Sequence, residues 1–196
     1  MKLNNKYYIL RHGQALSNVK GIASSWPEKF KNILTEKGKE IVEKVAETLK
    51  NTCAEQGRSI NIIFTSDLLR AKQTAEIVGE IIKVKPENAE ELREIDFGIL
   101  NGKPLAEWEK YFNSQEEKIN NAPQGAETYK EVSKRIFNFF SELDHKYIDK
   151  NILLVSHECP LTLLEWKVKG LSLLEGIRKY SGSNSIKKGE LRELNS

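Results

Sequence analysis

Three short apolar runs constrain the fold of this 196-residue chain more than any other feature. They occupy residues 6–10, 60–65 and 151–156, and patterns typical of amphipathic helices alternate with them. Short apolar runs separated by such helices are typical of a mainly parallel sheet that is covered by helices on both faces. We therefore predict an α/β fold with these runs as central strands.

The remaining elements follow from periodicity. Two weaker strands are expected at residues 81–85 and within residues 185–194. Thr35 is a suitable N-cap for a first helix, and apolar residues recur after it at intervals of three and four. A second helix is expected from Ser66 to about Ile82, and a long third helix from about residue 127 to 147. The apolar stripes of these helices are expected to form the core.

Polar residues with chemical potential follow the strand-like runs. Arg11 and His12 come directly after the first run, and His157 comes directly after the last. Arg70 is expected one turn into the helix that follows the middle run. The carboxyl ends of parallel strands meet at one edge of a sheet, where open α/β proteins form their ligand crevice. The sequence therefore predicts one site with two histidines and two arginines.

Composition excludes several classes of function. Residues 1–196 are expected to form a single domain, and no basic face stands out among 31 basic and 28 acidic side chains, which argues against nucleic acid as a partner. Cys53 and Cys159 are too few for a disulfide framework and lack metal-ligand spacing, so a reducing compartment is expected. No apolar stretch reaches membrane-spanning length. We expect a cytoplasmic protein with no membrane partner, and the oligomeric state stays open.

Residues 101–125 form an excursion from the expected sheet. Leu105, Trp108 and Phe112 have the spacing of a short amphipathic helix, and a polar segment follows them. A second loop, residues 19–33, is expected to wall the opposite side of the site. Such segments often set selectivity while the strands hold the reacting groups. Trp108 is the best candidate to contact a substrate.

The residues at the strand ends suit a phosphate monoester, which carries nearly two negative charges at neutral pH. Arg11 and Arg70 would match this charge with fork-shaped donors, and a protonated His157 is a further candidate. A neutral His12 would attack phosphorus and form a phosphohistidine. Nothing in this scheme requires a metal or a cofactor.

The leaving alkoxide of such a reaction needs a proton, so a carboxylic acid with a raised pKa is expected near the site. Four acidic residues cluster after the second helix, and their spacing does not choose among them: Glu90, Glu91, Glu94 and Asp96.

Five motifs give the chain a family resemblance. In order they read LRHGQALSN at residues 10–18, LTEKG at 34–38, SDLLRAKQTA at 66–75, LREIDFG at 92–98 and PQGAE at 123–127. The chain resembles the histidine phosphatase superfamily, also called phosphoglycerate mutase-like. The resemblance extends from residue 7 to about residue 194 and implies a three-layer α/β/α sandwich with a mainly parallel sheet.

The resemblance also implies a role for each matching residue. His12 would be the phosphorylated nucleophile and Glu94 the general acid. The phosphoryl oxygens would be held by Arg11, Arg70 and His157, with Asn18 as a further polar contact. The implied function is metal-independent and cofactor-independent hydrolysis of a small phosphorylated metabolite. Glu127, at the end of the last motif, is expected to cap or orient the long helix.

Two positions depart from the family pattern. Many members have glycine after the second histidine, where this chain has Glu158. A carboxylate there would weaken phosphate binding, raise the pKa of His157 or point to solvent, and the sequence leaves these alternatives open. Gln14 replaces the more frequent glutamate, which is a milder change. Cys159, next to Glu158, is expected to be a small filler beside the site.

Two other functions remain as alternatives. A phosphoglycerate mutase must keep its intermediate away from water, and such mutases usually carry a larger insert than the 25 residues of 101–125. A catalytically weak regulator that binds a phosphorylated ligand is the other alternative, and the intact set of arginines, histidines and Glu94 argues against it. The sequence does not identify the substrate.

Overall fold

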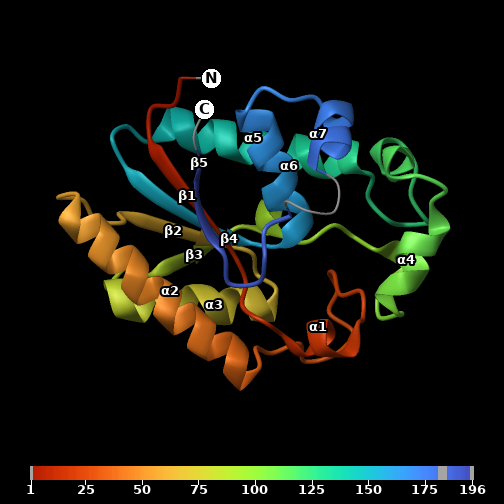
Figure 1. Ribbon diagram of the computed structural model, residues 1–196, viewed down its shortest axis with the longest axis horizontal. Helices are drawn as coiled ribbons and strands as arrows, with labels where there is room; N and C mark the ends of the chain where they lie inside the picture. Colours follow the sequence, from red (N-terminus) through yellow and green to blue (C-terminus); the bar gives the residue numbers. More distant parts are fainter. Residues whose placement is uncertain (1, 181–184, 195–196) are drawn as a thin grey trace.

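A five-stranded sheet forms the centre of the computed structural model, which describes residues 2–180 and 185–194 (Figure 1). The order of its strands is β3-β2-β4-β1-β5. The first four are parallel, and β5 runs antiparallel beside β1. The strands are β1 (Lys6–Arg11), β2 (Ile62–Thr65), β3 (Pro86–Asn88), β4 (Asn151–Ser156) and β5 (Leu191–Leu194).

Helices cover both faces of this sheet, so the predicted α/β/α sandwich with a mainly parallel sheet is confirmed. In Figure 1, α2 (Glu36–Glu55) and α3 (Leu69–Ile82) lie below the sheet, and α5 (Tyr129–Lys146) and α6 (Glu158–Val168) lie above it. The shorter helices are α1 (Leu16–Lys20), α4 (Leu105–Tyr111) and α7 (Leu173–Tyr180), with 3-10 turns η1 (Glu90–Leu92), η2 (Gly98–Leu100) and η3 (Gln115–Ile119).

The central strands are apolar throughout because both of their faces are buried. Along β1, Tyr7 and Ile9 pack on the side of α5 and α6, whereas Tyr8 and Leu10 pack on the side of α2 and α3. Burial of one large aliphatic side chain contributes about 1.5–3 kcal/mol. The buried apolar side chains form two clusters, one on each face of the sheet. They pack the strands against the helices and so fix where the strand ends lie.

The strand expected at residues 81–85 is wrong. Helix α3 continues to Ile82, and Lys83 ends it in the left-handed conformation with φ 62°. Ile81 and Ile82 pack in the core as part of the helix stripe. The strand follows three residues later as β3, where Pro86 pairs with Ile63. A short apolar run at the end of a helix has no periodicity that distinguishes it from a strand.

Helix boundaries show one agreement and one difference. Helix α2 begins after Thr35, whose hydroxyl accepts a hydrogen bond from the backbone of Gly38, as predicted. Helix α5 begins later than expected because Thr128 is its N-cap, in a reciprocal capping box with Glu131. Glu127 therefore lies outside the helix and does not cap it. The last strand is limited to Leu191–Leu194, within the expected 185–194.

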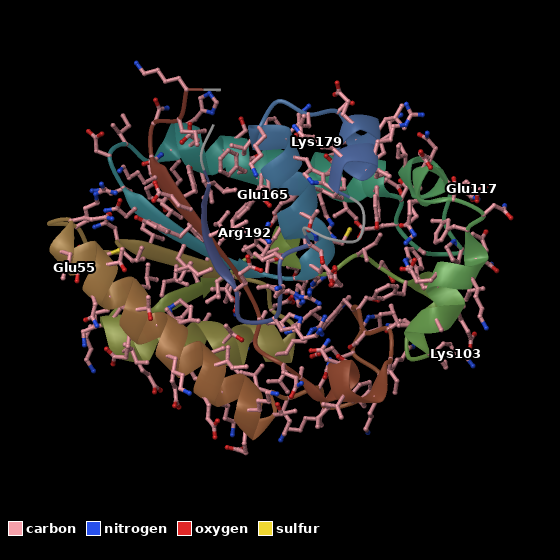
Figure 2. All side chains as sticks on the ribbon, viewed as in Figure 1. Glu55, Lys103, Glu117, Glu165, Lys179 and Arg192 are labelled. Atoms are coloured by element: carbon pink, nitrogen blue, oxygen red, sulfur yellow. The ribbon has the colours of Figure 1, made fainter. Side chains whose placement is uncertain are left out.

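The excursion 101–125 lies to one side of the sheet. Figure 2 places Lys103 and Glu117 on it at the right, across the molecule from Glu55 at the end of α2. Its helix α4 packs Trp108 edge-on against Phe97 and Phe112, with ring centroids 5.0 Å apart in both pairs. In the part of the chain that the structure describes, no helix is both long and apolar enough to cross a membrane.

Candidate active site

The register of β1 and β4 brings the two predicted histidines together. Arg11, the last residue of β1, pairs with Ser156, the last residue of β4. The backbone N–H of His12 then donates to the carbonyl of Ser156 at 3.0 Å. His157 is the N-cap of α6, and its ring centroid lies 5.0 Å from that of His12. Backbone pairing thus places the two residues that carry the imidazoles side by side.

Two glycines allow the segment after His12 to pack directly on the first turn of α2. A Cβ atom on Gly13 would lie 2.6 Å from the carbonyl oxygen of Gly38, which is closer than real Cβ contacts. A Cβ atom on Gly38 would likewise overlap the backbone of Gln14. The backbone N–H of Gly13 also donates to Thr74 Oγ1 at 3.1 Å. Residues 12–14 are therefore fixed between the sheet, α2 and α3.

The contacts of His12 define its tautomer. Its Nδ1 lies 2.7 Å from the carbonyl oxygen of Gly13. Since a carbonyl only accepts, Nδ1 must carry the proton, and Nε2 keeps its lone pair. Arg70 Nε donates to this Nε2 at 3.1 Å. Burial, together with the charges of Arg70 and Arg11, holds the pKa of His12 well below its usual value. The imidazole is therefore neutral and has an available ring nitrogen.

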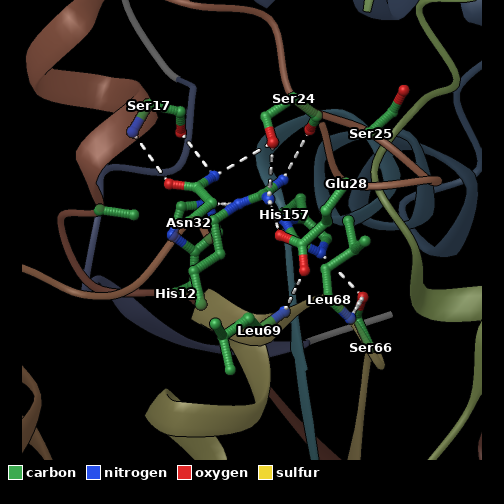
Figure 3. A network of polar contacts seen from close by, with 12 residues as sticks. His12, Ser17, Ser24, Ser25, Glu28, Asn32, Ser66, Leu68, Leu69 and His157 are labelled. Atoms are coloured by element: carbon green, nitrogen blue, oxygen red, sulfur yellow. Dashed lines mark hydrogen bonds and ion pairs between the residues drawn. The ribbon is translucent and has the colours of Figure 1, made fainter. Parts of the chain in front are cut away.

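Arg70 is held by the loop that precedes α2, and Figure 3 labels its partners Ser24 and Glu28 on that loop. Its Nη2 donates to the carbonyl of Ser24 at 2.9 Å, and its Nη1 lies 3.5 Å from a carboxylate oxygen of Glu28. Glu28 also accepts a hydrogen bond from the backbone of Leu69 at 3.1 Å. Burial lowers the pKa of Arg70 to about 10, so the guanidinium stays protonated at neutral pH.

Asn32 stabilises this loop through hydrogen bonds to Ser17 and Ser24. Neither Asn32 nor Glu28 was identified from the sequence as a site residue. The Asn32 side chain accepts from the backbone of Ser17 and donates to the hydroxyls of Ser17 and Ser24 (Figure 3). The loop 19–33 was expected to wall the site. No spacing within it reveals which side chains fold back onto Arg70, because the contact joins residues some 40 positions apart in the sequence.

Arg11 presents one edge of its guanidinium to the site. Its Nη1 donates to the carbonyl of Ile186 at 2.8 Å, and its Nη2 lies 2.7 Å from Glu158 Oε2. Its Nε is buried and has no hydrogen-bond partner among the described residues. Of the three alternatives that the sequence left open for Glu158, the structure shows a carboxylate paired with Arg11, and its effect on phosphate binding stays a prediction.

The structure distinguishes Glu94 from the other three acidic candidates. Glu94 lines the cavity beside Arg11, His12 and Arg70, and Oε1 accepts from the backbone of Ile95 at 3.0 Å. Burial raises its pKa, although the two arginines oppose the shift. Glu90, Glu91 and Asp96 do not line this cavity: Glu90 pairs with Arg93 at the surface, Glu91 is exposed, and Asp96 accepts hydrogen bonds from Ser25 and Gly98.

Two residues hold the backbone that carries Glu94. Glu127 accepts from the backbone N–H of Asp96 at 3.0 Å and forms a bidentate pair with Arg135. Arg135 in turn donates to the carbonyls of Glu91 and Glu94 at 2.7 and 3.2 Å. Glu127 is thus a support for the loop of the carboxyl group. Arg135 lies on the polar side of α5, where the sequence suggested no role.

His157 is fully buried beside His12 and is neutral. Burial, followed by the charge of Arg70, holds its pKa well below the usual value, so the expectation of a protonated His157 is not supported for the free site. Its Nε2 lies 2.9 Å from Ser66 Oγ, which already accepts from the backbone of Leu68. The Ser66 hydroxyl can either donate to Nε2 or accept from it, so this contact fits both tautomers of the ring. No described residue pairs with Nδ1 of His157.

Asn18 lines the same cavity from α1, the first helix of the chain. Its Oδ1 accepts from the backbone of Ala15 at 2.9 Å and so closes the first turn of α1. The residue lines the cavity together with Ser17 and Ser24. Its side-chain carbonyl is committed to the backbone of Ala15, and its contact with a phosphoryl group stays a prediction.

A cavity of about 570 Å³ joins Arg11, His12, Asn18, Arg70 and Glu94 to an apolar wall, and His157 lies behind His12 without lining it. The wall comes from the loop 19–33, the excursion 101–125 and the helices α5, α6 and α7, and Trp108 is part of it as expected. Trp26 of the loop is half-exposed and stacks on Arg93 instead. The apolar wall residues are Ile22, Ile95, Phe97, Leu105, Trp108, Tyr129, Leu163, Trp166 and Ile177.

Two further features complete the cavity. Cys159 lines it beside Glu158, and burial holds its pKa well above the usual value, which fits the expected role as a filler. Lys118 is almost fully buried at the far end and pairs with Glu109 at 2.7 Å. Within residues 2–180 and 185–194, no group of three or more histidine, cysteine or acidic side chains is arranged to hold a metal ion.

Several known proteins are similar to this chain in sequence. The probable phosphoglycerate mutase GpmB of Cronobacter sakazakii is 30% identical over 84% of this chain and 74% of that protein. The uncharacterized phosphatase PhoE of Bacillus subtilis is also 30% identical, over 57% of this chain, and the match spans about half of PhoE, 55%. The adenosylcobalamin/alpha-ribazole phosphatase of Escherichia coli is 26% identical over 85% of this chain and 80% of its own length.

Solved structures agree on the fold. YhfR of Bacillus stearothermophilus superposes with a TM-score of 0.80 at 22% identity, over 96% of this chain and 90% of YhfR. A mycobacterial glucosyl-3-phosphoglycerate phosphatase superposes with a TM-score of 0.77, also at 22% identity, over 97% of this chain and 89% of its own. The family model described as histidine phosphatase superfamily (branch 1) matches residues 7–186. The chain therefore belongs to the histidine phosphatase superfamily.

Proposed function

We propose that this chain is a phosphatase that hydrolyses monoesters of small phosphorylated metabolites through a phosphohistidine at His12, without a metal or a cofactor. The observation that carries the proposal is the neutral His12, whose Nε2 lies 3.1 Å from Arg70 Nε on the wall of a cavity that also contains Arg11 and Glu94. A nucleophile, two cationic forks and a carboxyl group with a raised pKa are the parts that this reaction needs.

Binding would place the phosphoryl group between the two arginines. Arg11 would donate a hydrogen bond from its Nε to a phosphoryl oxygen. The Nε–H of Arg70 would donate to a phosphoryl oxygen in place of His12, which frees the lone pair of His12 Nε2. The unpartnered Nδ1 of His157 would be a further donor for the same group in the tautomer that carries its proton there. Hydrogen bonds between charged partners in a buried site are the strong ones, so the arginines would supply most of the binding free energy.

The first half-reaction forms the bond between His12 Nε2 and phosphorus as the ester P–O bond breaks. Glu94 gives its proton to the leaving oxygen. The imidazole ring becomes positively charged, and the carbonyl of Gly13 at Nδ1 stabilises that charge. In the second half-reaction the Glu94 carboxylate takes a proton from water as the water attacks phosphorus. The P–N bond then breaks, and inorganic phosphate and neutral His12 are restored.

The cavity supports a small-molecule substrate. Its volume of about 570 Å³ lies in the range of typical ligand pockets. One end is charged, and the wall opposite carries aromatic and aliphatic side chains such as Phe97, Trp108 and Trp166. A phosphate ester whose organic group presents an apolar surface would match both ends.

Trapping the intermediate tests the proposal. The protein is mixed with an aryl phosphate labelled at phosphorus, quenched and digested, and the labelled peptide is sequenced. The label should reside on His12, and should be lost in acid and retained in base, as expected of a phosphoramidate. His12→Ala should carry no label and show no turnover. A label on a serine or an aspartate, or a strict requirement for an added metal ion, would contradict the mechanism.

Phosphoglycerate mutase is the second candidate, because relatives of similar identity carry that name. The same purified protein separates the two when it is given 3-phosphoglycerate. A phosphatase releases inorganic phosphate, and a mutase forms 2-phosphoglycerate without net release. A regulator that only binds a phosphorylated ligand would bind inorganic phosphate and hydrolyse no aryl phosphate.

A further inference from the structure

We propose that Glu158 is an internal competitor of the substrate's phosphoryl group for Arg11, and that it thereby sets the affinity of the site for phosphate. The inference rests on the proposed function, in which the phosphoryl group binds at Arg11. It begins with one contact: Glu158 Oε2 lies 2.7 Å from Arg11 Nη2.

The competition follows from how the guanidinium of Arg11 is used. A guanidinium binds an oxyanion best through two parallel N–H groups on one edge. Nη1 of Arg11 is committed to the carbonyl of Ile186, and Nε has no partner among the described residues. The edge formed by Nε and Nη2 is therefore the one available to a phosphoryl group. Glu158 occupies half of that edge.

Exposure identifies which partner would move. The side chain of Arg11 is only 9% exposed and is anchored by its backbone contact, whereas the side chain of Glu158 is 43% exposed. An incoming phosphoryl group would therefore displace the carboxylate and leave the guanidinium in place. The pKa of Lys188 responds to both partners, because burial and Arg11 lower it and Glu158 opposes them.

The position of Glu158 makes the effect specific to the phosphate end of the cavity. Glu158 is the first residue of α6 and follows His157, so its backbone is fixed by the same strand end that fixes the imidazoles. It adds a negative charge to the end of the cavity where the phosphoryl group would bind. A dianionic ligand must therefore overcome both a competing ion pair and a like charge. Inorganic phosphate, the product, should bind weakly and leave readily.

Calorimetric titration with inorganic phosphate tests this directly, because it does not depend on turnover. The proteins compared are the wild type, Glu158→Gln, Glu158→Gly and a control, Glu47→Gln. The control removes the same charge from an exposed ion pair with Lys50 on α2, outside the cavity. Glu158→Gln keeps the shape of the side chain, so the test does not depend on the glycine variant folding well.

The expected result is tighter phosphate binding in both Glu158 variants. Loss of a partly exposed ion pair and of one like charge predicts a Kd lower by about five- to tenfold. KM for an aryl phosphate should fall by a similar factor, with kcat within about twofold of the wild type. Glu47→Gln should match the wild type in all three quantities.

Three results would overturn the inference. An unchanged phosphate Kd in both variants would mean that Glu158 does not compete, and would leave the proposed phosphatase function intact. A large loss of kcat confined to alkyl phosphates in Glu158→Gln would instead make Glu158 the proton donor. Failure of phosphate to bind the wild type and every variant, with no turnover, would refute the proposed function and this inference with it.

Discussion

The polar end of the cavity and its apolar wall are built in different ways. At the polar end, Arg11, His12 and His157 stand on the ends of neighbouring parallel strands, where backbone hydrogen bonds fix their positions. The wall around Trp108 comes from helices and loops outside the sheet, including α5 and α6, and side-chain packing holds it together. The groups that we propose to react thus stand on strand ends fixed by backbone hydrogen bonds, and we expect the wall to tolerate changes in sequence that leave them in place.

Arg70→Ala should have the largest effect among substitutions that leave the nucleophile in place, because it removes a buried cationic fork from the polar end. We expect kcat/KM to fall for every phosphate ester, whatever its organic group, by a factor that corresponds to about 2–5 kcal/mol of lost transition-state stabilisation. Inhibition by vanadate should weaken in parallel. Steady-state kinetics with an aryl and an alkyl phosphate measure both effects. Vanadate inhibition equal to that of the wild type would mean that Arg70 does not contact the phosphoryl group.

Glu94→Gln should separate two kinds of substrate at the same polar end. Alkyl leaving groups need a proton, so their kcat should fall by about 10²- to 10⁴-fold, whereas aryl phosphates should lose much less. The wild-type rate on alkyl phosphates should fall as the pH rises through the raised pKa of Glu94, because the acid form is lost there. Glu94→Gln should lose this alkaline limb of the pH profile.

Glu91→Gln is the matched control for that experiment, since Glu91 is an exposed neighbour outside the cavity. It should keep both the rate and the pH profile of the wild type. Equal losses on alkyl and aryl substrates in Glu94→Gln would assign Glu94 a structural role.

Trp108→Leu should have the smallest effect, and one confined to the wall. Leucine keeps an apolar side chain between Phe97 and Phe112, so the fold should persist. We expect KM for a naphthyl phosphate to rise by roughly three- to tenfold, as loss of about 1 kcal/mol of aromatic contact predicts. The inhibition constant of inorganic phosphate should not change, because phosphate does not reach the wall. A parallel loss of phosphate inhibition would show that the two ends are coupled.

Local patterns determined much of the fold and part of the site. Apolar runs of strand length, together with Thr35 as an N-cap, placed three central strands and helix α2 within a residue or two. The strand ends then placed Arg11, His12 and His157 at one edge of the sheet. These inferences succeed because strand length, helix period and capping depend on residues close together in the chain. The same reliance on local pattern placed a strand at residues 81–85 instead of β3, because a short apolar run fits the end of a helix as well as a strand.

Only the tertiary structure decided which side chains meet. It placed Glu94, which the family resemblance implied, on the cavity and left Glu90, Glu91 and Asp96, among which spacing alone did not choose, outside it. It brought Glu28 to Arg70, Arg135 to the loop of Glu94 and Glu158 to Arg11. It also buried His157 near Arg70, and burial followed by the charge of Arg70 holds the pKa of His157 well below its usual value, so the ring is neutral. Each of these facts depends on the packing and desolvation of residues far apart in the chain, and no local pattern in the sequence records them.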